Sequence, residues 1–176
     1  HSLGTFEVEA DALSLLLGRP SMRISRMDSP DGVMSGQLFA GLERGVKGMN
    51  GRLAVGAMLA PIPIEAVELK GVTLVFRNGY CVQAGGEVTP VMALPVAEMA
   101  FGPGASGAVS CEGKRARVVM KSASGRERID FYVNSDGRYR GWMIIADTSA
   151  AVGAALAPLG FRSTAQGLAL SVEGRL

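Results

Sequence analysis

Apolar and polar residues alternate with a period of two along much of the chain, which is typical of strands with one buried and one solvated face. Ala116, Val118 and Met120 alternate with the basic Arg115, Arg117 and Lys121. The same alternation is found for Phe6, Val8 and Ala10, and for Leu168, Leu170 and Val172. Glycine supplies 24 of the 176 residues, roughly twice its usual share of about 7%. The pattern predicts a mostly β protein.

Four turn dipeptides punctuate these stretches: Asp31-Gly32, Asn50-Gly51, Asn78-Gly79 and Asp136-Gly137. Such pairs favour tight hairpins, because both central residues of a type I′ turn need a positive φ. A two-residue Asp136-Gly137 loop in the segment 126–145 pairs Phe131 with Trp142, the only Trp of the sequence. The same register pairs Val133 with Arg140 and Ile129 with Ile144. We therefore predict that Phe131 and Trp142 share the apolar face and form the structural core.

Helical signals are few. Asp11 can cap a short turn over 12–17, and Asp147, Thr148 or Ser149 can cap a helix over 150–157 before Pro158. The Pro-containing segments 60–64 and 89–106 indicate extended connections. We expect a single domain over 3–176, with a strongly curved antiparallel sheet or open half-barrel plus one or two short helices, and we interpret His1-Ser2 as a tag remnant.

Charge and hydropathy narrow the function classes. Lys and Arg number 18 against 16 Asp and Glu, for a formal net charge of +2, and the arginines are spread along the chain. This balance argues against a nucleic-acid-binding groove. The longest apolar stretches, 54–64 and 150–161, are interrupted by Gly or Pro and too short to span a bilayer.

Catalytic and metal-binding patterns are weak. The only histidine is His1, so the sequence offers no Ser-His-Asp triad and no histidine metal site. The GxGxxG string at Gly102–Gly107 is followed by strand-like residues instead of the helix that a dinucleotide site requires. The carboxylate pairs Glu7/Glu9 and Glu65/Glu68 are best interpreted as solvated strand positions. We expect no enzymatic activity, no metal and no cofactor.

Basic residues on alternate positions allow a second interpretation. Arg115, Arg117, Lys121, Arg126 and Arg128 could attract a phosphate or an acidic partner, but the solvated face of a sheet is the simpler explanation. Arg140 could form a cation–π contact with Trp142, or it could merely cover apolar surface. The solvated face and the covering arginine are the interpretations that we favour.

Cys81 and Cys111 lack the CxxC spacing of zinc ligands. They are either a structural disulfide or two buried thiols. A bridge would close a segment rich in Pro and Gly, and on chain-entropy arithmetic a loop of about thirty residues yields roughly 3–4 kcal/mol. Since disulfides persist in oxidising compartments, we expect a bridge and an extracytoplasmic location.

The order of motifs resembles a known family. The stretch Gly71–Gly86 that holds the first cysteine, the second cysteine at 111, the Ser135–Tyr139 turn, Ala154–Phe161 and the closing Gly167–Leu176 are together similar to type II secretion system protein N. The resemblance covers about residues 32–176. It implies a non-catalytic accessory component of a secretion machine, with its bulk in the periplasm and an N-terminal helix in the inner membrane, a helix that this sequence does not include.

Two functions follow as expectations. The first is a scaffold that binds other type II secretion subunits, in the inner-membrane platform or at the secretin, through exposed strand edges. The alternative is a periplasmic carrier that holds a lipid or other hydrophobic ligand in an open β half-barrel. The alternating strands offer Val, Leu, Ala and Met inward, which favours a filled core and therefore the scaffold.

Overall fold

Strands of a single antiparallel sheet dominate the computed structural model, which describes residues 5–10, 21–29, 32–93, 105–146 and 149–176, with side chains from Met34 onward. The described strands follow the order of the chain from β1 to β10, and β12 then lies between β10 and β11. They are β1 (Thr5–Ala10), β2 (Ser21–Ser29), β3 (Gly32–Phe39), β4 (Glu43–Ala54), β5 (Ile64–Arg77), β6 (Tyr80–Met92), β7 (Gly107–Glu112), β8 (Arg115–Lys121), β9 (Glu127–Asn134), β10 (Arg138–Ile145), β11 (Arg162–Thr164) and β12 (Gly167–Arg175). The predicted mostly β, antiparallel fold is confirmed.

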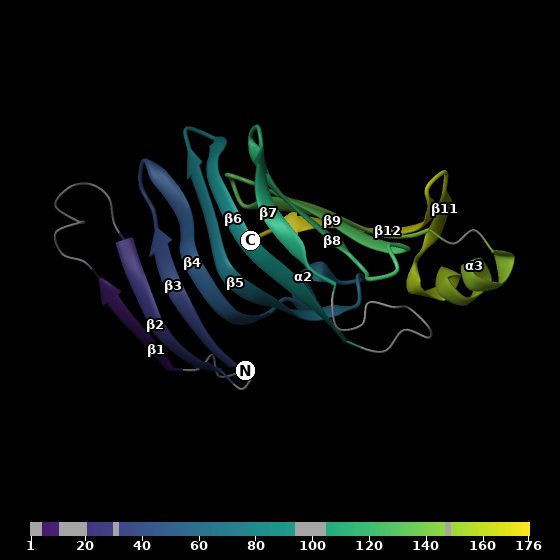
Figure 1. The fold of residues 1–176 in the computed structure, drawn as a ribbon, viewed down its shortest axis with the longest axis horizontal. Helices are drawn as coiled ribbons and strands as arrows, with labels where there is room; N and C mark the ends of the chain where they lie inside the picture. The colour runs from purple at the N-terminus through teal and green to yellow at the C-terminus, as the bar shows by residue number, and fades with distance from the viewer. Residues whose placement is uncertain (1–4, 11–20, 30–31, 94–104, 147–148) are drawn as a thin grey trace.

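The sheet is strongly curved and open, with β1 at one edge and β11 at the other (Figure 1). Register shifts recur in β3 to β6 near four glycines that we call the glycine crease, Gly36, Gly48, Gly71 and Gly86. Three of them, Gly48, Gly71 and Gly86, have φ values of 60°, 61° and 88°, which glycine adopts without steric cost. Because bulges and glycine kinks bend strands and increase their twist, we attribute much of the curvature to the crease.

The dipeptide Asn50-Gly51 lies beside this crease inside a strand, so the prediction of a turn there is wrong. Both residues lie inside β4. The Asn50 side chain donates to the carbonyl of Gly48 and accepts from the N–H of Gly71, both at 2.8 Å. The side chain thereby satisfies backbone groups that the bulges remove from the ladder. By contrast, Asn78-Gly79 forms the β5–β6 turn as predicted, with φ values of 51° and 82°.

The β9–β10 hairpin turns at Asp136-Gly137, but its register differs by one residue from the predicted one. The loop has three residues, 135–137, and Gly137 takes a φ of 82°, as in the turn-plus-bulge connection. Trp142 is therefore opposite Asp130, and Phe131 is opposite Gly141. A slip of one residue moves side chains to the other face, so the predicted pairing of Phe131 with Trp142 is wrong.

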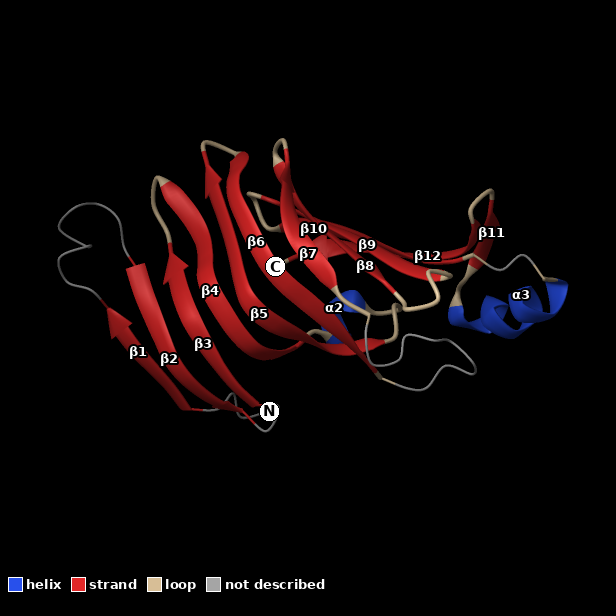
Figure 2. Ribbon diagram, in the orientation of Figure 1, coloured by secondary structure: helices blue, strands red, loops and turns tan. Residues whose placement is uncertain are grey.

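The two helices of the described chain are short (Figure 2). α3 (Ala150–Leu156) begins at Ser149, whose hydroxyl accepts from the N–H of Val152, and it continues into the 3-10 turn η1 (Ala157–Leu159). This helix was predicted. The one-turn α2 (Gly56–Leu59) was not predicted, and it contacts both β5 and β12.

Several predictions lie outside the described residues. These are the tag remnant His1-Ser2, the turn over 12–17, the first residue of Asp31-Gly32, most of the Pro-containing segment 89–106, and residues 102–104 of the GxGxxG string.

Buried apolar side chains from both halves of the sheet, β1–β6 and β7–β12, form one core cluster. Ile64 of β5, Ile129 of β9 and Met143 of β10 are its most enclosed members, each at most 1% exposed. The predicted alternation is confirmed where side chains are described, because Ala116 and Met120 are buried whereas Arg115 and Lys121 are exposed. The strand sides that face the core are thus apolar, and the opposite side of the sheet carries the charges.

Candidate interaction surfaces

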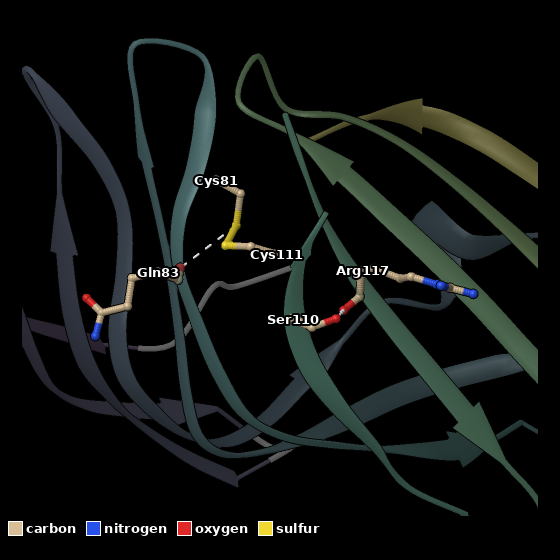
Figure 3. Close-up of a disulfide and its surroundings, with 5 residues drawn as sticks. All are labelled: Cys81, Gln83, Ser110, Cys111 and Arg117. Atoms are coloured by element: carbon tan, nitrogen blue, oxygen red, sulfur yellow. Dashed lines mark hydrogen bonds between the residues drawn. A yellow bond between two sulfur atoms is a disulfide. The ribbon is translucent and has the colours of Figure 1, made fainter. Parts of the chain in front are cut away.

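The sparsest ladder of the sheet joins β6 to β7, and it is the place where the two cysteines meet. Only two residue pairs connect these strands, Glu87 with Ala108 and Val88 with Gly107. We call this junction between β6 and β7 the seam. At its other end a disulfide joins Cys81 to Cys111, with Cα atoms 5.4 Å apart (Figure 3). The Cys81 N–H also donates to the Gly113 carbonyl at 3.1 Å. The bridge, at the predicted positions, thus ties the strands where the ladder does not.

Phe131 and Trp142, the two residues predicted to form the core together, lie on opposite faces of the sheet. Phe131 packs against the core cluster and stacks on Tyr139, with ring centroids 5.5 Å apart. Trp142 is half-buried on the outer face and meets Tyr132 edge-on at 5.7 Å. Phe131 therefore contributes to the core, whereas Trp142 is part of the outer surface.

Arginines and aromatic rings alternate across the outer face of β8, β9, β10 and β12. The Arg115 and Arg117 guanidiniums lie over the Tyr132 ring at 4.3 and 5.4 Å, and Arg140 lies over Trp142 at 5.8 Å. The favoured sequence interpretation, in which Arg140 only covers apolar surface, was therefore incomplete. We call this surface the arginine–aromatic face, and it comprises Arg115, Arg117, Tyr132, Arg138, Arg140, Trp142, Glu173 and Arg175.

Ion pairs compensate part of the positive charge on the arginine–aromatic face. Arg117 shares the carboxylate of Asp130 with Arg128, and Arg140 pairs with Glu173 at 2.8 Å. Arg175 donates to a backbone carbonyl, that of Asp136, at 3.3 Å. An open hollow of about 750 Å³ in this face is lined by four arginines and one carboxylate, so it carries a positive excess.

Within the described part of the chain, the outer backbone edge of β12 is uncovered over most of its length. β11 pairs only with Gly167–Ala169, and no described backbone group bonds the same edge beyond that point. Ser171, Glu173 and Arg175 are exposed. An unpaired strand edge next to arginines and a Trp is the feature that sequence reasoning missed. Because β11 is short, the rest of this edge of β12 stays unpaired. No residue pattern in the sequence predicts where β11 ends.

An apolar hollow of about 230 Å³ lies on the inner side of the sheet. Its walls come from both halves of the sheet and from α2, and include Val67, Val88, Val118, Phe131 and Met58. The inner side is therefore not completely filled. The volume lies below the roughly 300–1,000 Å³ of sites that enclose drug-sized ligands.

Catalytic constellations do not emerge from the described part of the chain. No group of three or more His, Cys, Asp or Glu side chains there is placed to hold a metal. Glu65 is exposed and pairs with Arg52 at 3.2 Å, and Glu68 is exposed on the same strand. Gly107, the last residue of the GxGxxG string, begins β7, so a strand follows that string. No described helix has the length and apolar character needed to cross a membrane.

These features define an open, curved β-sheet protein with an apolar inner side, a charged outer side and an uncovered edge. The chain matches the family model of type II secretion system (T2SS) protein N over residues 1–171. It therefore belongs to that family, a family of accessory secretion components, and has a role in type II secretion. Membership implies an envelope location and interaction with other components of the machine. Neither the curated proteins nor the solved structures gave a match.

Proposed function

We propose that this protein is a non-catalytic scaffold of the type II secretion machinery, located in the periplasm as part of the inner-membrane assembly. Its partners are other secretion subunits, in the inner-membrane platform or at the secretin. The observation that carries the proposal is the uncovered edge of β12 in an open sheet, because unpaired N–H and C=O groups are a ready template for another chain. The disulfide between Cys81 and Cys111 supports the oxidising compartment.

Site-directed photo-crosslinking in cells tests this proposal. A photoreactive residue at Ser171 or Glu173 on β12 should crosslink to a type II secretion subunit that mass spectrometry identifies. The same residue at Lys70, exposed on the central strand β5, is the control and should give much less product. The scaffold proposal fails if no crosslink to a secretion subunit forms from either the β12 edge or the β1 edge.

A second candidate function rests on the apolar hollow. Its lining is almost entirely aliphatic, so it could hold an acyl chain, as a periplasmic lipid carrier requires. Its size argues for the scaffold, because about 230 Å³ is small for a cavity that must enclose most of a ligand. Native mass spectrometry separates the two functions, since a carrier should retain a lipid at near-unit stoichiometry.

A further inference from the structure

The uncovered edge of β12 and the arginine–aromatic face lie side by side. A second outer hollow, of about 380 Å³, is lined by both: Arg140 and Trp142 from β10, and Ser171, Val172 and Glu173 from β12. A chain added along β12 would thus meet free backbone groups and the arginine–aromatic face at the same time.

The hydrogen-bonding direction of each β12 residue follows from the ladder. In antiparallel pairs, alternate residues direct both N–H and C=O to the same neighbour. The Leu176 N–H donates to the Gly137 carbonyl at the β10 side, at 2.9 Å. Even-numbered residues of β12 therefore pair with β10, and Ser171, Glu173 and Arg175 direct their backbone groups to the uncovered edge.

The positive charge of the second half of the chain indicates which kind of partner can bind along β12. Residues 105–176 contain ten Lys and Arg against six Asp and Glu, a formal charge of +4, whereas residues 1–104 carry −2. On the arginine–aromatic face, Arg138 and Arg140 keep 73% and 59% of their side-chain surface exposed although each has an acidic neighbour. Exposed guanidiniums bind carboxylates in a bidentate manner, and Trp and Arg are the residues that most often dominate binding energy at interfaces.

We propose that an extended acidic segment of a partner protein adds to the edge of β12 as a further strand. Its backbone pairs with Ser171, Glu173 and Arg175, and its carboxylates contact Arg175 and Arg140 beside Trp142. This inference rests on the proposed scaffold function and specifies its edge and the chemistry of its partner.

Peptide titration of the purified protein tests the inference. The probe is a ten-residue peptide that alternates Glu with Val or Thr, and its matched control carries Lys in place of Glu. Because Trp142 is the only Trp, its fluorescence reports occupancy directly. We expect the acidic peptide to shift the emission and to slow amide exchange at Ser171, Glu173 and Arg175, and we expect neither effect from the basic peptide.

Two variants with matched controls locate the site. Ser171→Pro removes an edge donor but leaves the β10 ladder intact, and Arg175→Glu reverses a charge at the edge. Each should weaken binding at least tenfold. Ser171→Ala, and Arg126→Glu at the far turn of the same half of the sheet, should stay within twofold of the parent. If Ser171→Pro does not fold, the binding of Arg175→Glu and the amide exchange of the parent still test whether the peptide binds at the β12 edge.

Several results overturn the inference. They are equal binding of the basic peptide, unchanged binding by a folded Ser171→Pro variant, binding of anionic phospholipid vesicles without binding of the peptide, or self-association that occupies the β12 edge in place of the peptide. In any of these cases, crosslinks in cells between the protein and secretion subunits would still support the scaffold function, so the two proposals fail separately.

Discussion

Met143 and Trp142 are neighbours on β10 whose side chains lie on opposite faces of the sheet. Met143 is 0% exposed in the core, whereas Trp142 is half-buried against Tyr132 and Arg140. Hydrophobicity alone would rank Trp142 as the more important core residue. The β9–β10 register assigns it instead to the outer face, where large aromatic residues favour binding.

The two side chains should therefore contribute differently to stability. We expect Met143→Ala to lower the free energy of unfolding by about 2–5 kcal/mol, as for other buried large-to-small changes. Trp142→Ala should cost about 1–2 kcal/mol, since it loses an aromatic pair worth about 0.5–1.5 kcal/mol and part of its burial. Urea denaturation measures both. An equal or larger loss for Trp142→Ala would mean that the ring faces the core.

The alternation of apolar and polar residues predicts the faces of some strands but not of others. Simple alternation predicts which face of β8 and of β12 is buried. Ala116 and Leu170 are assigned to the core whichever residue is taken as the start of the strand. The relation of β9 to β10 depended on whether the loop has two or three residues. Asp136-Gly137 suits both loops, so the sequence left open which face Trp142 takes.

At the level of elements, the glycine crease determines how β4, β5 and β6 pass one another. A Cβ on Gly86 would lie 2.6 Å from the Gly71 carbonyl oxygen and 2.6 Å from the Val72 Cα. These are backbone atoms, so the clash can be relieved only by moving a strand. The adjacent Gly85 has open space around its Cβ position.

This contrast gives a matched pair of variants. Gly86→Ala should lower the free energy of unfolding by at least about 1–3 kcal/mol, because the left-handed conformation alone carries a strain of that order and the strand contact adds to it. Gly85→Ala should change stability by no more than about 0.5 kcal/mol. Thermal or urea unfolding compares the two variants. Equal effects would show that the crease does not need glycine at position 86.

The disulfide at the seam is a second feature that holds neighbouring strands together, here β6 and β7. With two ladder pairs, this junction gains little from hydrogen bonds, so the bridge that spans 30 residues of sequence should matter. Its cysteines were predicted from their isolation and from the loose loop between them. The seam itself depends on long-range pairing and could not be anticipated.

Removal of the bridge should lower the free energy of unfolding by about 2–4 kcal/mol. The double variant Cys81→Ser, Cys111→Ser provides one measurement and reduction of the parent provides another. A reductant should bring the parent to the level of the variant and leave the variant itself unchanged. Free alkylation of both thiols without reductant, in protein prepared under oxidising conditions, would contradict the prediction.

The two halves of the sheet share one core but differ in charge. The cluster joins Ile64 and Val88 of the first half to Ile129 and Met143 of the second, so curvature brings distant strands together without closing the sheet. The expectation of a strongly curved antiparallel sheet or open half-barrel is confirmed. The extent of the free β12 edge and the size of the inner hollow depend on where β11 ends and on how α2 sits, which alternation does not encode.

Whether the inner hollow is merely imperfect packing or a ligand site can be decided by filling it. Val118 lines the hollow on β8, and the next residue, Val119, lies on the outer face and is also half-buried. For a scaffold, Val118→Leu should stabilise the protein by about 0.5–2 kcal/mol, because cavity-filling changes commonly gain that much. Val119→Leu should have an effect within about 0.5 kcal/mol. The parent should also leave purification without a retained lipid in native mass spectra. A lipid at near-unit stoichiometry that Val118→Leu displaces would instead make the carrier the primary function.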